Sequence, residues 1–299
     1  MDNNPAHNLG IQESRACGPG FFVQTARVTF SRAQVSQLLD DFDVSPSRAL
    51  GQNFVADPNT VRKIVRLACV DAETKVVEIG AGLGCLTLGL AETGAPVTAV
   101  EIDKHVLPAL RETMSACSNV EVVEGDAMKL DWDAVLPPDN GPYVLVANLP
   151  YNIATPLVAD ILDEVPQIQR MLIMVQREAG ERFAAPIGTK DFGAVTLKVS
   201  YWAKAKVLAN VPRTIFVPRP NVDSVLVEIV RRDEVAVDVD RQELFALIRA
   251  GFAQRRKMLR RSLAGLVDEN RFAVAGVDST ARAETLGLED WARLVRAQS

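Results

Sequence analysis

Apolar side chains recur at two spacings along the chain, one typical of helices and the other of buried strands. Spacings of three and four residues predict a helix over 31–42, with Ser31 as its N-cap, and a second helix beginning at Asp57-Pro58. Residues 1–28 have no clear periodicity and mix Asn, Pro, Gly and Gln, so we expect a flexible N-terminal extension. Regular structure is therefore predicted to begin near residue 29.

From residue 76 the pattern alternates between short apolar runs and helix-length segments. A parallel pair of strands needs a crossover of this length, so the alternation predicts an α/β domain with a mostly parallel sheet, over 29–238. Two later strands lie close together in the sequence, which predicts an antiparallel end to the sheet. Strands are predicted at 76–79, 97–100, 120–123, 143–147, 171–175, 207–211 and 225–230, and helices at about 84–93, 104–116 and 154–164.

The chain after Arg241 has only helical spacing. Its apolar positions are three or four residues apart and no further strand-like run occurs, which predicts a second, smaller, all-helical domain over 239–299. These positions are Leu244, Leu247, Ile248, Phe252, Leu259, Leu263, Trp291, Leu294 and Val295.

Composition narrows the class of protein. The chain has 299 residues, of which 48% are apolar and 24% charged, values typical of a globular protein large enough to need no disulfides. Its four Cys and two His are too scattered for a zinc site, so we expect no bound metal. No stretch of about 18 apolar residues and no secretory signal occurs. We therefore expect a cytoplasmic protein that does not enter a membrane.

The formal net charge of −5 argues at first against a nucleic-acid partner, but the charge is unevenly distributed. Residues 1–147 carry 11 basic and 19 acidic side chains, whereas residues 148–261 carry 18 basic and 13 acidic ones. Residues 262–299 carry 4 basic and 6 acidic side chains. The basic side chains are densest in one cluster. If this segment is helical, some of these side chains would lie on adjacent turns and could contact a phosphate backbone. Charge alone, however, favours an ordinary helix face exposed to solvent. The cluster comprises Arg255, Arg256, Lys257, Arg260 and Arg261.

A glycine-rich turn follows the first predicted strand of the α/β domain. It reads Glu78-Ile79-Gly80-Ala81-Gly82-Leu83-Gly84, and its alternate glycines allow a tight bend and a close approach to a ligand. The dinucleotide fingerprint has its third glycine one position later, where this chain has Cys85. A role in holding a pyrophosphate is therefore disfavoured.

Acidic residues end the next two predicted strands. Glu101 is placed to accept hydrogen bonds from both ribose hydroxyls of an adenosine-containing cofactor, and Asp126 to accept one from the adenine amine. Each residue alone is compatible with an ordinary structural role. Because the carboxyl ends of parallel strands meet in one crevice, we expect the glycines and both acids to form one site.

The fourth predicted strand ends in Asn148-Leu149-Pro150-Tyr151. The Asn148 side-chain oxygen can accept a hydrogen bond from an amine, Pro150 directs the Leu149 carbonyl, and Tyr151 offers a flat face to a base. An amine held by two acceptors has its lone pair free to attack an electrophile. A rigid turn with a buried Tyr would explain the same tetrapeptide on its own.

These motifs, with Leu50-Gly51-Gln52-Asn53-Phe54, together resemble the ribosomal small-subunit (16S) RNA adenine dimethyltransferases. Further segments of residues 31–299 follow that family's order: Gln176-Arg177-Glu178, Thr189-Lys190-Asp191-Phe192-Gly193, Phe216-Val217-Pro218-Arg219-Pro220-Asn221-Val222-Asp223-Ser224 and Phe252-Ala253-Gln254-Arg255-Arg256-Lys257. The chain departs from the family at Arg48-Ala49, where two basic residues are usual, and at Val55 and Ala81. We expect a weaker RNA contact at Ala49 and unchanged chemistry at the other two positions.

The resemblance implies a Rossmann-like methyltransferase domain followed by a helical RNA-binding domain. It assigns the cofactor, S-adenosyl-L-methionine, to Asn53, Val55, Gly80, Gly82, Glu101, Asp126 and Asn148. It assigns the target adenine to Asn148, Leu149, Pro150 and Tyr151, with Phe216 stacking on the other face of the base. The basic cluster is expected to bind RNA, with an affinity whose dependence on salt weakens when Arg255, Arg256 and Lys257 are neutralised.

The implied activity is N6,N6-dimethylation of two adjacent adenosines near the 3′ end of small-subunit ribosomal RNA, within an assembling 30S particle, by a monomeric enzyme. Three alternatives remain. The related large-subunit adenine dimethylases usually have Ile in place of Leu149 and a shorter C-terminal domain. A noncatalytic assembly factor would keep the fold but fail to bind the cofactor. A nicotinamide-dependent oxidoreductase is disfavoured by the glycine spacing and by the Asn148–Tyr151 turn.

Overall fold

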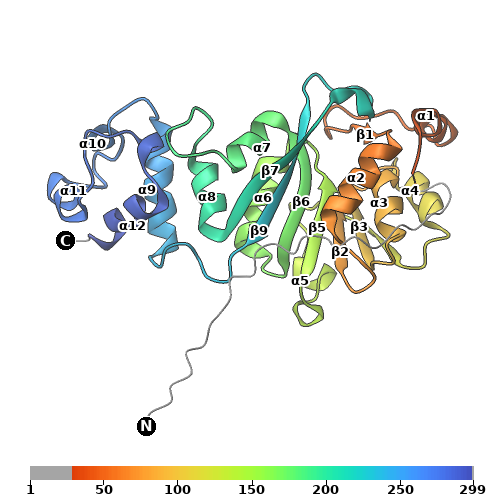
Figure 1. The fold of residues 1–299 in the computed structure, drawn as a ribbon, viewed down its shortest axis with the longest axis horizontal. Coiled ribbons are helices and arrows are strands. Elements are labelled where there is room, and N and C mark those ends of the chain that lie inside the picture. The colour runs from red at the N-terminus through yellow and green to blue at the C-terminus, as the bar shows by residue number, and fades with distance from the viewer. Residues whose placement is uncertain (1–28, 298–299) are drawn as a thin grey trace, which may run out of the picture.

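The computed structural model describes residues 29–297, and its central feature is a seven-stranded sheet (Figure 1). The strand order is β4-β3-β2-β5-β6-β9-β7; the first five of these strands are parallel, and β9 runs antiparallel to both β6 and β7. The predicted parallel sheet with an antiparallel end is thus confirmed. The strands are β2 (Lys75–Ile79), β3 (Val97–Glu101), β4 (Val120–Glu124), β5 (Tyr143–Asn148), β6 (Ile168–Gln176), β7 (Ala203–Val211) and β9 (Ser224–Arg231). The predicted extension, 1–28, lies outside the described residues.

Helices connect the strands and cover the sheet. The two predicted N-caps are confirmed, because the side chains of Ser31 and Asp57 accept hydrogen bonds from the backbone N–H groups of Gln34 and Thr60. The helices of this part are α1 (Arg32–Asp41), α2 (Pro58–Ala68), α3 (Cys85–Ala91), α4 (Leu107–Met114), α5 (Trp132–Val135), α6 (Ala154–Glu164), α7 (Arg177–Phe183) and α8 (Ala194–Trp202), with 3-10 turns η1 (Pro138–Asn140) and η2 (Arg213–Ile215).

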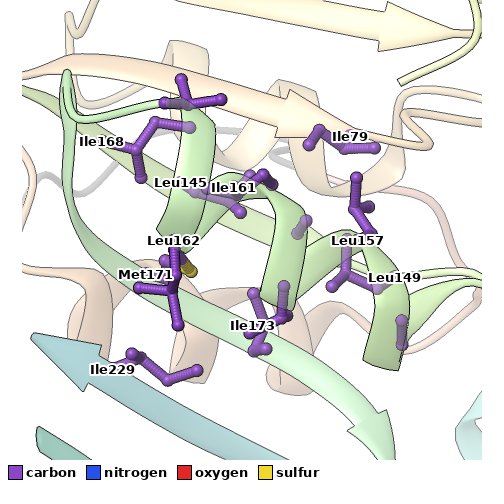
Figure 2. Packing of buried hydrophobic residues seen from close by; sticks show 14 of the residues in the cluster. Ile79, Leu145, Leu149, Leu157, Ile161, Leu162, Ile168, Met171, Ile173 and Ile229 are labelled. Atoms are coloured by element: carbon purple, nitrogen blue, oxygen red, sulfur yellow. The ribbon is translucent and has the colours of Figure 1, made fainter. Parts of the chain in front are cut away.

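A core of aliphatic side chains lies between the sheet and α6. Leu157 and Ile161 of α6 pack with Leu145 of β5 and Ile173 of β6, and all four are buried (Figure 2). Burial of each such side chain stabilises the fold by about 1.5–3 kcal/mol. The last carbonyl groups of α6 accept hydrogen bonds from the guanidinium group of Arg231 in β9. The apolar strand pattern therefore anchors the helix that follows the Asn148–Tyr151 turn.

The position of β2 in the sheet creates a crevice. From β2 the chain moves outward to β3 and β4, then returns to place β5 on the other side of β2. At such a switch point the loops after the two central strands diverge, and ligands bind between them at the carboxyl ends of the strands. The glycine turn follows β2 and the Asn148–Tyr151 turn follows β5.

A two-stranded sheet, which the sequence did not predict, closes one side of this crevice. Strand β1 (Phe54–Val55) pairs antiparallel with β8 (Phe216–Val217). Two-residue strands carry no measurable periodicity, so only contact between distant segments could reveal them. The pairing joins the Leu50–Phe54 motif to the segment that contains Phe216.

The predicted helical domain is present at the C-terminal end (Figure 1). Its core includes Leu244, Phe272 and Trp291, together with Leu197 and Tyr201, which belong to α8. The domain boundary near residue 239 therefore stays a prediction, because α8 packs on both parts. Its helices are α9 (Arg241–Ala253), α10 (Leu259–Ser262), α11 (Glu269–Ala275) and α12 (Leu288–Arg296), with the 3-10 turn η3 (Ala283–Thr285).

The basic cluster does not lie on one continuous helix. Helix α9 ends at Ala253 and α10 begins at Leu259, so Arg255, Arg256 and Lys257 lie in the turn between them. Within 29–297, no helix is long and apolar enough to cross a membrane, and no group of three or more His, Cys, Asp or Glu side chains is arranged to hold a metal ion.

Candidate cofactor and substrate site

The crevice at the carboxyl ends of the strands is a cavity of about 230 Å³. The loops after β2, β3, β4 and β5 line it, together with the segment around β1. It brings together ten of the residues that the sequence assigned to the cofactor or to the base: Asn53, Val55, Gly80, Gly82, Glu101, Asp126, Asn148, Leu149, Pro150 and Tyr151.

The glycine turn lies tightly against its neighbours. Gly80 and Gly82 have φ angles of 74° and 57°, which glycine adopts without steric strain. A Cβ atom on Gly82 would come within 2.9 Å of the Phe54 ring, and one on Gly80 within 3.3 Å of Pro150. The turn therefore needs glycine both for its backbone conformation and for its contact with the two motifs that flank it.

Glu101 fastens the loop after β3 to the glycine turn. Its Oε2 atom accepts a hydrogen bond of 2.8 Å from the Gly82 N–H, and Oε1 accepts bonds from the N–H groups of Ile102 and Asp103. Burial raises the pKa of this carboxyl, although the three N–H donors act in the opposite direction. A carboxylate has about four acceptor sites, so one near Oε2 is left for a ligand hydroxyl.

Asp126 lies two residues after β4, and its carboxylate is held at both oxygens. Oδ1 accepts a hydrogen bond from the Met128 N–H, and Oδ2 lies 3.2 Å from the Lys129 ammonium. The backbone hydrogen bond, with the nearby lysine, lowers the pKa of Asp126. The group is therefore ionised at neutral pH and can accept a hydrogen bond from an amine.

Asn148 presents an unsatisfied acceptor to the cavity. Its Nδ2 group donates a 2.9 Å hydrogen bond to the Asn53 carbonyl, which sets the orientation of the amide. Its Oδ1 atom is buried and has no hydrogen-bond partner within the described chain. The Leu149 carbonyl next to it also accepts no hydrogen bond from residues 29–297, while the Leu149 N–H is bonded to the Met174 carbonyl. An unsatisfied buried acceptor costs about 1–3 kcal/mol, so a donor in the cavity would be favoured.

Tyr151 and Phe216, the two aromatic residues assigned to the base, differ in position. Tyr151 is half-buried, lines the cavity, and its hydroxyl lies 2.6 Å from the Ser224 hydroxyl, which fixes the ring. Phe216 is fully buried in the core beside Val55 and does not line the cavity. Stacking of Phe216 on a base therefore stays a prediction, and it requires movement of the β1–β8 ladder.

The sequence assigned no role of its own to several residues of the cavity, although Gln52 belongs to the Leu50–Phe54 motif. The Gln52 amide donates a 2.7 Å hydrogen bond to Asp103, which ties the segment before β1 to the loop after β3. Ile102 and Met128 line the cavity with partly exposed apolar side chains. Ile102 directly follows Glu101, and Met128 lies two residues after Asp126. An exposed apolar residue so close to an acidic strand end is the signal that could have identified them.

Glu78 begins the glycine motif but is buried beneath the cavity. Burial raises its pKa to about 8, and the charge of Glu101 acts in the same direction. The adjacent Cys85 thiol is also buried, and its pKa is raised to about 12. At neutral pH the floor of the cavity therefore contains a neutral carboxyl and a neutral thiol, and Asp126 supplies a negative charge.

Replacement of Glu78 by Gln should remove a pH-dependent loss of stability. The unfolded carboxyl titrates near 4.5, whereas the folded protein retains the proton up to about pH 8. Between these values the folded state binds more protons, so this group lowers the free energy of unfolding by about 1.4 kcal/mol for each pH unit of increase. Urea unfolding of wild type and Glu78→Gln should therefore diverge in favour of the variant from about pH 5 to about pH 8. Parallel stability curves would contradict the neutral carboxyl.

The basic cluster lies outside the cavity and its members are not equivalent. The Arg255 guanidinium is half-buried, forms a 2.7 Å ion pair with Glu284, and donates to the Thr189 carbonyl. The side chains of Arg256, Lys257, Arg260 and Arg261 are exposed. Arg255 thus connects the helical domain to the 186–191 loop, and the other four are available to a ligand.

Comparison with known proteins agrees with this geometry. The chain is 44% identical over 280 residues to the ribosomal RNA small subunit methyltransferase A of Cutibacterium acnes, covering 89% of this chain and 93% of that protein. It is 43% identical over 273 residues to the protein of that name from Streptomyces coelicolor, covering 88% of this chain and 94% of the relative.

Two solved structures share the architecture. The 23S rRNA methyltransferase ErmE matches with a TM-score of 0.65 and 27% identity, over 82% of this chain and 99% of its own. A dimethyladenosine transferase from Plasmodium falciparum matches with a TM-score of 0.66 and 25% identity, over 80% of this chain and 94% of its own. The family model for ribosomal RNA adenine dimethylase matches residues 45–298, which include the glycine turn, both acids and the Asn148–Tyr151 turn. The chain therefore belongs to the ribosomal RNA adenine dimethylase family.

Proposed function

We propose that this protein transfers methyl groups from S-adenosyl-L-methionine to N6 of two adjacent adenosines near the 3′ end of small-subunit ribosomal RNA. It is an rRNA adenine dimethyltransferase that acts in small-subunit biogenesis. The observation that carries the proposal is the pair of free acceptors, Asn148 Oδ1 and the Leu149 carbonyl, at the carboxyl end of β5. These two acceptors match the two hydrogens of an exocyclic amine.

The cavity suits an adenosine-containing cofactor. The close packing of the glycine turn, the remaining acceptor site on Glu101 and the ionised Asp126 provide a cradle for the ligand, acceptors for ribose and an acceptor for an amine. Ile102 and Met128 supply apolar faces for a flat ring. Asn53, Val55, Gly80, Gly82 and Asn148 would complete the contacts with the cofactor. When bound, S-adenosylmethionine supplies an electrophilic methyl group.

The protein contributes position and electrostatics more than proton transfer. Asn148 and the Leu149 carbonyl would hold the amine hydrogens, so that the nitrogen lone pair is directed toward the methyl group. Pro150 fixes this turn, and the Tyr151 ring would support the base after it has left its stack. The attack makes the amine acidic, and water can accept the proton. No histidine lines the cavity in the described chain, and this mechanism needs none.

The helical domain is proposed to bind the phosphate backbone through Arg256, Lys257, Arg260 and Arg261. Arg255 belongs to the same surface, but its ion pair with Glu284 gives it mainly a structural part. We further propose that the substrate is the assembling 30S particle in the cytoplasm and that the enzyme acts as a monomer.

Substitution of the four exposed basic residues by Ala should reduce the salt dependence of RNA affinity. Each lost phosphate contact removes about 0.7–0.9 from the slope of log affinity against log salt concentration, so the quadruple variant should lose about three. The matched control is Lys204→Ala combined with Lys206→Ala, which removes two exposed lysines of β7. Filter binding of small-subunit RNA over a salt series measures the slope, and an unchanged slope would place the RNA surface elsewhere.

The proposed activity is tested by transfer of labelled methyl groups to unmethylated small subunits, with unmethylated large subunits as the competing acceptor. Modified bases are located by reverse-transcription stops. The proposal expects two adjacent dimethyladenosines in the small-subunit RNA and no label in the large subunit. Label in the large subunit alone would assign the chain to the large-subunit enzymes, and failure to bind the cofactor would leave a noncatalytic assembly factor.

A further inference from the structure

A second hollow, of about 620 Å³, opens between the end of β6, α7, the 186–191 loop and the segment between η2 and β9. Three cationic side chains, Arg177, Lys190 and Arg213, line it together with four carboxylates that include Asp191 and Asp223. Its polar character distinguishes it from the cavity described above, which is lined mainly by glycine and apolar residues.

The hollow lies directly beside the group proposed to hold the amine. Asn148 is level with Met174 in the β5–β6 ladder, and the hollow begins at Gln176, two residues further along β6, or about 7 Å. Gln176 is level with Ser224, whose hydroxyl contacts the Tyr151 hydroxyl. The Tyr151–Ser224 contact therefore separates the cavity from the hollow, at a distance that a neighbouring nucleotide can cover.

Some charged groups in the hollow are paired with a neighbour, and others have no partner. Asp223 lies 3.4 Å from the Arg177 guanidinium and also accepts a hydrogen bond from the Arg213 N–H. Lys190 and Asp191 are adjacent in the sequence and make no side-chain hydrogen bond or ion pair with any residue of 29–297. The Glu181 carboxylate, which also lines the hollow, likewise makes no side-chain hydrogen bond or ion pair with residues 29–297. The hollow thus offers one unpaired ammonium, that of Lys190, beside the unpaired carboxylates of Asp191 and Glu181.

This pattern favours a nucleobase over a phosphate. Four carboxylates beside three cations would repel a phosphodiester, whereas an adenine edge presents both an amine donor and a ring-nitrogen acceptor. We propose that the hollow binds the base next to the target adenosine, with the Lys190 ammonium donating to a ring nitrogen and Asp191 accepting from the amine. The inference rests on the proposed function, in which the neighbour of one target is the other adenosine.

The helical domain holds this wall of the hollow in place. Arg255 donates to the Thr189 carbonyl, and the Glu284 carbonyl accepts a 2.9 Å hydrogen bond from the Gly188 N–H. The backbone immediately before Lys190 is therefore fixed from the C-terminal side. Arg255 acts as a positioning residue for the second base, and this role accounts for its ion pair with Glu284.

The test combines enzyme variants with altered RNA. Unmethylated small subunits are reconstituted from ligated RNA in which one of the two adenosines is replaced by an abasic residue, in separate preparations, and methyl transfer to the remaining adenosine is measured. With intact RNA, Lys190→Ala should lower kcat/KM about tenfold. With the abasic neighbour, wild type should fall by a similar factor and Lys190→Ala should cause no further loss, because the two changes remove the same contact.

The matched control is Lys204→Ala. Lys204 is exposed and lies opposite Val230 in the β7–β9 pairing. Val230 in turn lies opposite Arg170, near the start of β6, whereas the hollow lies at the other end of that strand. This variant should match wild type on every substrate. Asp191→Ala gives a second double-mutant cycle. In this cycle the neighbouring adenosine is replaced by purine riboside, which lacks the 6-amino group.

Independent, multiplicative losses for Lys190→Ala and the abasic residue in both preparations would overturn the inference while leaving the proposed function intact. Absence of methyl transfer by wild type to intact small subunits would instead overturn the proposed function, and the inference with it.

Discussion

Asn148→Ala should lower methyl transfer to small subunits by about 1000-fold, the loss expected when a preorganised polar group at a reacting centre is removed. The amide holds two positions at once. Its Nδ2 group bonds to the Asn53 carbonyl, and its buried Oδ1 atom is free for the amine. Alanine removes both, so the amine loses one of its two acceptors and the segment around Asn53 loses its tie to β5. Single-turnover transfer of labelled methyl groups measures the effect.

The control for this substitution is Asn210→Ala. Asn210 is exposed on β7 and makes no side-chain hydrogen bond with residues 29–297, so the same chemical change there should leave activity at the wild-type value. Thermal unfolding of Asn148→Ala should stay close to wild type, because removal of an unsatisfied buried acceptor offsets the loss of one hydrogen bond. Activity within a few-fold of wild type would refute the assigned role of Asn148.

Gly82→Ala should weaken binding of S-adenosylmethionine by about 100-fold. An added Cβ would lie 2.9 Å from the Phe54 ring, and it would force either the glycine turn or the segment around β1 to move. The Gly82 N–H also donates to Glu101, so a displaced turn would shift the carboxylate that is proposed to bind the ribose of the cofactor. We expect such a displacement to weaken cofactor binding more than it slows the methyl-transfer step. Calorimetric titration with the cofactor measures the affinity.

A matched control separates this contact from the strain of the backbone itself. Gly276 has a φ angle of 62°, close to the 57° of Gly82, but a Cβ atom there would meet nothing within 4 Å. Both substitutions place alanine in the left-handed region, at a cost of about 1–2 kcal/mol in stability. Only Gly82→Ala should lose affinity, and equal affinities for the two variants would show that the turn tolerates a side chain.

Local pattern was enough for most of the fold. The central strands β2, β3, β5 and β6 have apolar runs because residues on both of their faces are buried. The helices have caps and apolar stripes that can be recognised from each segment alone. The β1–β8 ladder was not predictable, because its paired residues are 161 and 163 positions apart in the sequence and each strand contains only two residues. Much of the candidate site was predictable for a related reason: carboxyl ends of neighbouring parallel strands converge whatever the loops contain.

The sequence by itself determined the α/β order, the glycine turn, the acids at the strand ends and the tetrapeptide proposed to hold the amine, since each depends on residue type and position relative to a strand. Only the tertiary structure decided which of these side chains are buried, protonated or paired. It made Glu78 neutral by burial, placed Phe216 in the core, and joined Arg255 to Glu284. It also placed Lys190 and Asp191, without a side-chain partner among residues 29–297, in the hollow that Arg177 and Asp223 line. Burial and pairing depend on segments that are distant in the chain, and for that reason the net charge of −5 gave no indication of where RNA would bind.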